Sequence, residues 1–193
     1  MTLQVDRYRE EWQAEWDAFV RESRNGTFLL ERGFMEYHKD RFVDHSLVIR
    51  SDDGRLVAVL PAAERGQDLH SHPGLTYGGL VFGTRTGTSA AMDALEAVRT
   101  YMRAAGFRVL HYKTIPWVYH RNPAEEDRYA LFRAGATLSR RDVLSVVPRD
   151  NRLRYQERRA RGVKSAAKAG VSVVESRDFG AFWAVLEANL LER

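Results

Sequence analysis

Two β-rich runs, VDHSLVIR (residues 43–50) and RLVAVLPA (residues 55–62), joined by SDDG (residues 51–54), decide the fold of this chain. The runs are rich in β-branched and aliphatic side chains, which favour strands. The linker contains Asp-Gly, a dipeptide typical of tight hairpin turns because glycine readily adopts a positive φ angle. The stretch therefore predicts an antiparallel hairpin, and a third strand is expected at residues 75–82.

Helical patterns lie on both sides of these strands. Apolar side chains recur every three or four residues, and glycines follow several of these segments as stop signals. Helices are expected within residues 10–23, 28–42, 88–105 and 124–134, and further strands at residues 107–115 and 136–147. This order predicts an α/β (α+β) layered fold, with a mixed, largely antiparallel sheet flanked by helices.

The composition narrows the class of protein. The chain has 193 residues, of which 44% are hydrophobic and 29% are charged, as in ordinary globular proteins. It contains no cysteine, which excludes a disulfide framework, thiolate zinc sites and a cysteine nucleophile. No apolar run approaches the roughly 20 residues of a membrane span, so we expect a cytoplasmic protein.

Positive charge is concentrated in one segment. The net charge of the chain is +4, but residues 149–168 alone carry eight Lys or Arg and two Asp or Glu, a balance of +6. Residues 151–169 also show a narrow apolar stripe, which predicts a basic helix. Any interaction with a polyanion is therefore expected there.

The composition changes abruptly after Pro148. We expect a first domain at residues 1–148, a basic linker helix at 149–170, and a truncated second domain at 171–193 with a strand at 171–175 and a helix at 178–191. The last segment resembles the aromatic helix near the start of the chain, which suggests a repeated domain. On this interpretation the sequence is part of a longer protein, and this part alone is inactive.

A polar, glycine-bearing stretch, HSHPGLTYGGLVF (residues 70–82), is the main candidate site. Its glycines would let either a ligand or another segment approach the backbone closely, although an irregular strand with a bulge fits the same pattern. The substrate-binding candidates are His70, Ser71, His72, Tyr77, Gly78 and Gly79, with Lys113 and Tyr119 from the strand and loop at residues 107–120. We expect Lys113 either to balance a phosphate or carboxylate or to form a surface salt bridge.

Histidines in the polar stretch are candidate ligands for a metal ion. His70 and His72 would form half of a zinc site if extended, with His111 and His120 as distant ligands. Without cysteine or a nearby carboxylate partner we assign no metal site. No serine, histidine and aspartate order or pair of carboxylates stands out, so the catalytic residues remain unknown.

One motif resembles a known family. Residues 158–173 follow the pattern Arg-x-x-Arg-x-Val-Lys-x-Ala-x-Lys-x-Gly-Val-x-Val. This resembles the junction motif of the FemAB-type aminoacyltransferases, which are tandem GNAT-like proteins, and residues 76–80 resemble their glycine-bearing strand. The resemblance implies a GNAT-like layered fold and transfer of an aminoacyl or acyl group to an amine of a peptidoglycan-like cell-envelope precursor.

The resemblance implies no cofactor beyond the acyl donor, which is aminoacyl-tRNA or acyl-CoA. The loop at residues 83–89 lacks a full pyrophosphate-binding glycine pattern, so CoA use is unsupported here. The basic helix would contact a polyanion, either tRNA or a nucleotide-linked acceptor, or would only tie two domains together. The polyanion-binding candidates are Arg158, Arg159, Arg161, Lys164 and Lys168.

Two other functions stay open. One is an acyl-CoA-dependent N-acyltransferase acting on a cell-envelope sugar or peptide precursor. The other is a non-catalytic nucleic-acid or ligand-binding module that keeps a GNAT-like fold. For either transferase we expect a small-molecule or lipid-linked acceptor. The sequence does not indicate the oligomeric state.

Overall fold

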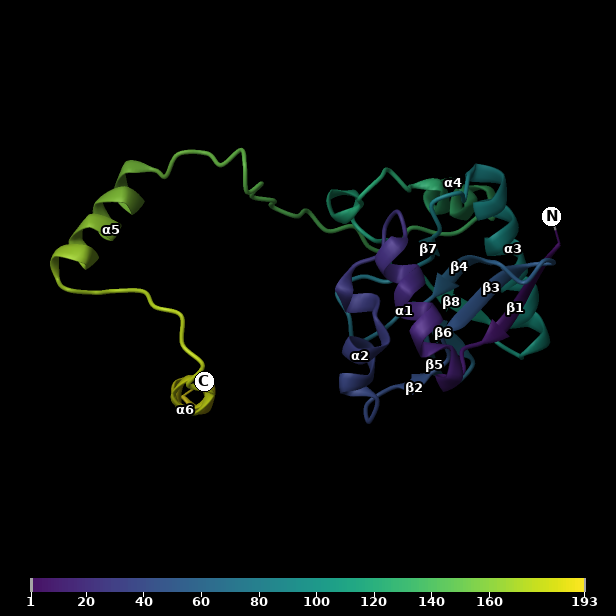
Figure 1. Ribbon diagram of the computed structural model, residues 1–193, viewed down its shortest axis with the longest axis horizontal. Helices are drawn as coiled ribbons and strands as arrows, with labels where there is room; N and C mark the ends of the chain where they lie inside the picture. The colour runs from purple at the N-terminus through teal and green to yellow at the C-terminus, as the bar shows by residue number, and fades with distance from the viewer. Residues whose placement is uncertain (1, 193) are drawn as a thin grey trace. The chain divides into compact units, whose positions relative to one another are not determined.

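The computed structural model describes residues 2–192, and the chain divides into two compact units, Met1–Val143 and Leu144–Arg193 (Figure 1). Each unit is described by itself. Within the described residues, no helix is long and apolar enough to cross a membrane.

The first sheet is built around the predicted hairpin. Its strands are β1 (Leu3–Arg7), β3 (Leu47–Ser51), β4 (Leu56–Leu60) and β7 (Val81–Phe82). They pair in the order β1-β3-β4-β7, and every pair is antiparallel. Gly54 has a φ of 81° in the turn between β3 and β4, which glycine adopts without a steric penalty. The hairpin prediction is therefore confirmed.

The predicted third strand is mostly absent. Only Val81 and Phe82 of residues 75–82 are in β7. The side-chain amide of Asn25 occupies the outer edge of this strand: its nitrogen donates to Leu80 O at 2.9 Å, and its oxygen accepts from Phe82 N at 2.8 Å. A buried side chain thus forms the hydrogen bonds that a neighbouring strand would form.

A second sheet contains β2 (Val43–Asp44), β5 (Ala63–Arg65), β6 (Asp68–His70) and β8 (Val109–His111), in the order β2-β5-β6-β8. The β5–β6 hairpin was not predicted, because its strands have three residues each and little apolar patterning. β6 and β8 pair in parallel. The predicted strand at residues 107–115 is confirmed only for the three residues of β8.

Helices cover both faces of the first sheet. The helical segments of the first unit are η1 (Glu10–Trp12), α1 (Gln13–Glu22), η2 (Phe28–Leu30), α2 (Arg32–Met35), η3 (Glu36–His38), α3 (Thr88–Ala104), η4 (Trp117–Tyr119) and α4 (Glu126–Arg133). All four predicted helical regions contain helical segments.

The side chains of β3 and β4 alternate between two hydrophobic cores. Leu47, Ile49 and Leu60 pack with residues of α3 and α4. Val48 and Val59 pack with residues of α1 and α2. Because successive side chains of a strand point to opposite faces, this division places one helical layer on each side of the sheet. The predicted layered fold, with a largely antiparallel sheet flanked by helices, is confirmed.

The second unit contains α5 (Glu157–Lys168) and α6 (Phe179–Leu191). The helix predicted at residues 151–169 therefore begins later than expected. Asp178 caps α6 by accepting a hydrogen bond from Ala181 N at 3.0 Å. The strands predicted at residues 136–147 and 171–175 are wrong: both segments are exposed and unpaired. Strands need backbone partners, and neither segment has one among the described residues.

Candidate functional site

The polar stretch leaves β6 through a tight turn. His72 has a φ of 45°, the single positive value among the described non-glycine residues, and its carbonyl accepts a hydrogen bond from Leu75 N at 3.2 Å. A left-handed residue other than glycine is uncommon and marks a conformation held by its surroundings. His72 is buried, with its ring 6.1 Å from that of Phe42.

The glycines of this stretch bring chain segments together. A Cβ on Gly78 would lie 2.5 Å from Ser71 O, and one on Gly79 would lie 2.8 Å from Lys113 O. Gly79 also has a φ of 87°, which disfavours other residues. Both glycines are buried. The space where a side chain would extend is filled by protein, so these glycines allow another segment of the chain to approach the backbone closely.

Ser71 and Lys113 meet at the exit of β8. The Ser71 hydroxyl accepts a hydrogen bond from Lys113 N at 2.7 Å, and Lys113 Nζ donates to Leu75 O at 2.8 Å. Burial and the nearby charge of Arg140 lower the pKa of Lys113. No carboxylate among residues 2–192 pairs with this lysine. The side chain of Lys113 therefore links the segment after β8 to the polar turn through the carbonyl of Leu75. It also places an amine group near the surface.

Tyr77 and Tyr119 form an aromatic pair beside this turn. Their ring centroids are 5.4 Å apart, and the Tyr77 hydroxyl lies 2.9 Å from Thr27 Oγ1. Tyr77 is buried and burial raises its pKa, whereas Tyr119 is half exposed. Trp117 is also exposed on the same short helix, η4. The rings of Trp117 and Tyr119 are therefore each accessible to a ligand.

A buried acid lies behind the turn. The Tyr112 hydroxyl accepts a hydrogen bond from Leu80 N at 2.7 Å and donates to Asp127 Oδ2 at 2.9 Å. Burial raises the pKa of Asp127 and raises that of Tyr112 well above its usual value. Asp127 is one of several acidic residues at the start of α4. Nothing in the sequence distinguishes it from its neighbours, so its burial could not be predicted. This pair joins β8, the approach to β7 and α4.

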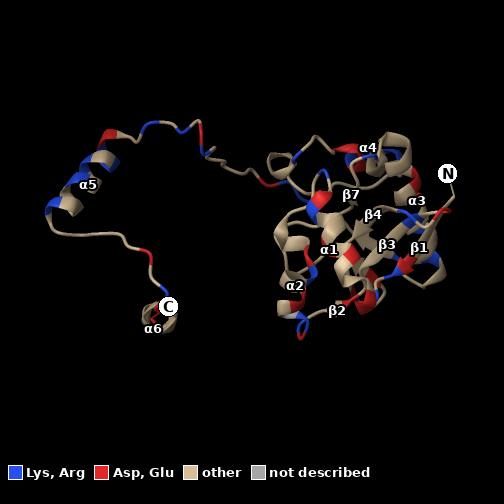
Figure 2. Ribbon diagram, viewed as in Figure 1, with Lys and Arg blue, Asp and Glu red and all other residues tan. Residues whose placement is uncertain are grey.

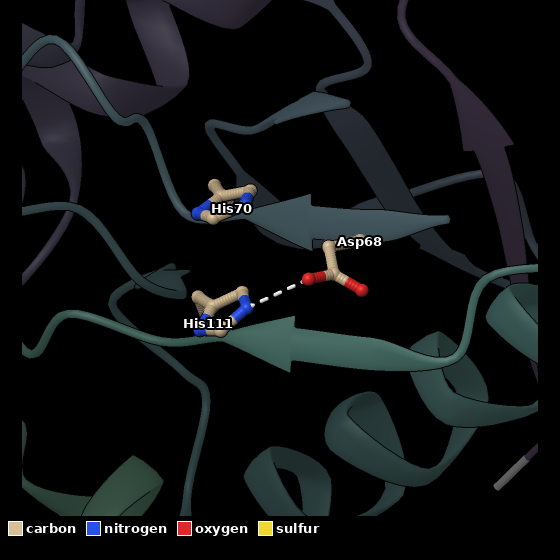
Figure 3. A group of neighbouring side chains, drawn as sticks. All are labelled: Asp68, His70 and His111. Atoms are coloured by element: carbon tan, nitrogen blue, oxygen red, sulfur yellow. Dashed lines mark hydrogen bonds and ion pairs between the residues drawn. The ribbon is translucent and has the colours of Figure 1, made fainter. Parts of the chain in front are cut away.

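Three side chains gather at the ends of β6 and β8 (Figure 3). The rings of His70 and His111 stack with centroids 4.3 Å apart and planes 16° apart, and His111 Nε2 lies 3.0 Å from Asp68 Oδ2. Burial, followed by the neighbouring His111, lowers the pKa of His70. His72 does not belong to this group. Asp68 was missed from the sequence, where its signal is the Asp-x-His spacing of a strand too short to recognise.

A cavity of about 240 Å³, lined by apolar side chains and by three arginines, lies elsewhere in the first unit. Its lining includes Leu95, Arg99, Met102, Arg103, Phe107, Arg108, Leu110, Leu131, Ala134 and Ala136. None of the predicted site residues lines it.

The predicted polyanion-binding residues all lie on α5 in the second unit (Figure 2). Arg158, Arg159, Arg161, Lys164 and Lys168 are exposed. None of them forms an ion pair with another residue in the described part of the chain. At 100° per residue, all except Arg159 fall within roughly a third of the helix circumference, opposite Val163. α5 therefore presents a stripe of net positive charge, in which Glu157 is the one acidic residue on the same face.

Comparisons with known proteins add little to this geometry. No family model matches the chain, and no curated protein matches it. The solved structure of L-PGS from Bacillus licheniformis is similar at 15% identity with a TM-score of 0.36. The similarity covers 55% of this chain and 32% of that one, so the chain spans about a third of that protein. A likeness this slight carries no argument about function.

Proposed function

We propose that this chain belongs to an acyltransferase of the FemAB-like type, which transfers an aminoacyl or acyl group to an amine of a peptidoglycan-like cell-envelope precursor. The observation that carries the proposal is the stripe of unpaired cations on α5, because it coincides with the FemAB-like motif at residues 158–173. The layered fold of the first unit is compatible with a GNAT-like domain. The expected donor is aminoacyl-tRNA.

The proposed reaction is acyl transfer from an ester to an amine. A neutral amine attacks an ester carbonyl, a carbon–nitrogen bond forms, the carbon–oxygen bond to the donor breaks, and the proton of the amine passes to the leaving oxygen or to water. This route requires aligned substrates and donors for the developing oxyanion, without a covalent protein intermediate. On this proposal Tyr119 and Lys113 contact the acceptor, since both are accessible at the polar turn.

The charge stripe on α5 suits a phosphate backbone. Arg158 and Lys168 are ten residues apart, or about 15 Å along the helix, which spans several phosphates of a nucleic-acid strand. Tyr155 is the single aromatic residue in the basic segment, so base stacking contributes little. Binding should therefore be mainly electrostatic and sensitive to salt.

Neutralising the stripe tests this role. The variant carries Arg158→Gln, Arg161→Gln and Lys164→Gln, and tRNA affinity is measured by fluorescence anisotropy over a series of salt concentrations. Because each lost phosphate contact reduces the slope of log K against log salt by about 0.7–0.9, the magnitude of the slope should decrease by roughly 2.1–2.7 for the three contacts. The matched control neutralises Arg55, Arg85 and Arg133, which are exposed cations of the first unit, and should retain the wild-type slope.

The outcomes distinguish the competing functions. Equal slopes for the α5 variant and the wild type would remove α5 from the proposal. Transfer assays on the longest natural form of the protein, with aminoacyl-tRNA or acyl-CoA as donor and an amine-bearing envelope precursor as acceptor, identify the donor. Turnover with acyl-CoA alone would support the N-acyltransferase, and tRNA binding without turnover would support a non-catalytic module.

A further inference from the structure

The backbone of β6 and β8 places three potential ligands on one side of the second sheet. His70 and His111 are directly opposed in the parallel register. Asp68 lies two residues before His70, and residues i and i+2 of a strand point to the same face. The grouping therefore follows from strand pairing and does not depend on a flexible loop.

The three side chains are close enough to share one ion. One ligand atom from each residue can be chosen so that all lie within 4.8 Å of one another, and Asp68 Oδ2 is already 3.0 Å from His111 Nε2. Tetrahedral zinc with bonds of about 2.0–2.1 Å separates its ligand atoms by about 3.4 Å. The remaining adjustment is at most roughly 1.4 Å, which rotation of an accessible imidazole supplies.

We propose that Asp68, His70 and His111 form a binding site for a divalent transition-metal ion, with Zn²⁺ as the best match. Two imidazole nitrogens and one carboxylate oxygen are ligands that Zn²⁺, Co²⁺ and Ni²⁺ accept, whereas Mg²⁺ and Ca²⁺ prefer oxygen alone. This site is separate from the proposed transferase function and does not rest on it.

Three protein ligands leave a coordination position open. The side chains of Asp68 and His111 are 38% and 51% exposed, so an ion and a fourth ligand can enter from solvent. The positive charges of Arg65 and Lys113 act on His70 from nearby. These cations oppose a bare metal ion but favour an anionic fourth ligand, such as hydroxide or the carboxylate of a small molecule.

A bound ion would also join two short strands. β6 and β8 have only three residues each, so their pairing rests on few hydrogen bonds. A metal held by residues from both strands constrains their separation. Binding should therefore raise the melting temperature of the protein, because a ligand that binds only the folded state stabilises it.

Titration of the metal-free, untagged chain with ZnCl₂, followed by isothermal titration calorimetry, tests the site. We expect one ion per chain, a rise in melting temperature, and a visible Co²⁺ absorption band in the range of four- or five-coordinate complexes. His70→Ala, His111→Ala and Asp68→Asn should each weaken Zn²⁺ binding at least about tenfold, since even the loss of a ligand's outer partner costs that much.

His120→Gln serves as the matched control, because it removes a histidine outside the group and should leave the affinity unchanged. Circular dichroism confirms that each variant is folded, and Asp68→Asn retains the size of the side chain. Absence of Zn²⁺ binding by the wild-type chain would overturn the proposal. Binding that is equally strong in all three ligand variants, or matched by Mg²⁺, would overturn it as well.

Discussion

His45 is a buried histidine held by two polar side chains. Its Nδ1 lies 2.6 Å from Glu64 Oε2, and its Nε2 lies 2.9 Å from the Tyr101 hydroxyl. Burial lowers the pKa of His45, although the hydrogen bond to Glu64 acts in the opposite direction. Arg7 also lowers the pKa, and Asp44 raises it. The imidazole is therefore favoured in its neutral form when the protein is folded.

This environment predicts a pH dependence of stability. The unfolded chain binds a proton at His45 with a pKa of about 6.5, whereas the folded chain takes it up only at lower pH. The free energy of unfolding should therefore fall as pH decreases below about 6.5, with a slope from this group of at most about 1.4 kcal/mol per pH unit. Urea denaturation between pH 7.5 and 5.5 measures the slope.

His45→Gln supplies the comparison, because glutamine keeps hydrogen-bonding capacity without titrating in this range. The variant should lose less stability than the wild type as pH falls from 7.5 to 5.5. Parallel pH profiles for the two proteins would show that His45 does not contribute.

The close packing of the segment before β7 against the residues that follow β8 depends on Gly79. Its φ of 87° would strain any L-residue, and a Cβ there would contact Lys113 O and the Tyr112 ring at 2.8 Å. Gly79→Ala should therefore lower the free energy of unfolding by more than the roughly 1–2 kcal/mol expected for left-handed strain alone.

Gly54→Ala separates the cost of left-handed backbone strain from the cost of steric overlap at the Cβ. Gly54 has a similar φ of 81°, but no atom beyond its two chain neighbours lies within 4 Å of the position that a Cβ would take there. It should show the conformational cost without the steric one. Chemical denaturation of both variants gives the comparison, and an equal loss at the two positions would mean that the crowding at Gly79 is relieved by small shifts.

Local signals predicted the elements that carry strong patterns of their own. The β3–β4 hairpin has two apolar runs and an Asp-Gly turn, and α3 has a helical period ending near a glycine. The β5–β6 hairpin has neither, and it exists because β5 pairs with β2 and β6 pairs with β8. Residues 136–147 show the opposite case, because a strand-like pattern remains unpaired without a partner.

Only part of the candidate site was predicted, because local sequence patterns do not show which distant strands pair. The sequence singled out His70, Lys113 and Tyr119, which the structure places near the surface. It also grouped His72 with His70, but the left-handed turn sends His72 toward Phe42. The pairing of His70 with His111, and the arrival of Asp68 beside them, depend on a parallel register that no local pattern encodes.

Among the residues whose burial the structure describes, all the buried ones belong to the first unit. Both hydrophobic clusters are formed by side chains between Leu3 and Ala134, and α5 and α6 contain no buried residue. Because folding stability comes mainly from buried apolar area, the first unit should fold without the second.

Truncation after Val143 tests this independence. The chain of residues 1–143 should show a cooperative transition with a midpoint in urea close to that of the full chain. A peptide of residues 144–193 should have low helicity by circular dichroism, since helices of 12 and 13 residues are marginal without packing. Loss of cooperative unfolding in the truncated chain would contradict the expectation.

The amide of Asn25 has a consequence for how these molecules behave at high concentration. An uncovered β7 would offer its free carbonyl and N–H groups to a strand of another molecule, which is the first step of side-by-side polymerisation. The Asn25 amide bonds Leu80 O and Phe82 N, and Arg24 N donates to Phe82 O at 3.0 Å, so this template is covered by the segment that precedes η2. The contacts that complete the sheet within the molecule therefore leave fewer free backbone groups at this edge for a strand of another molecule.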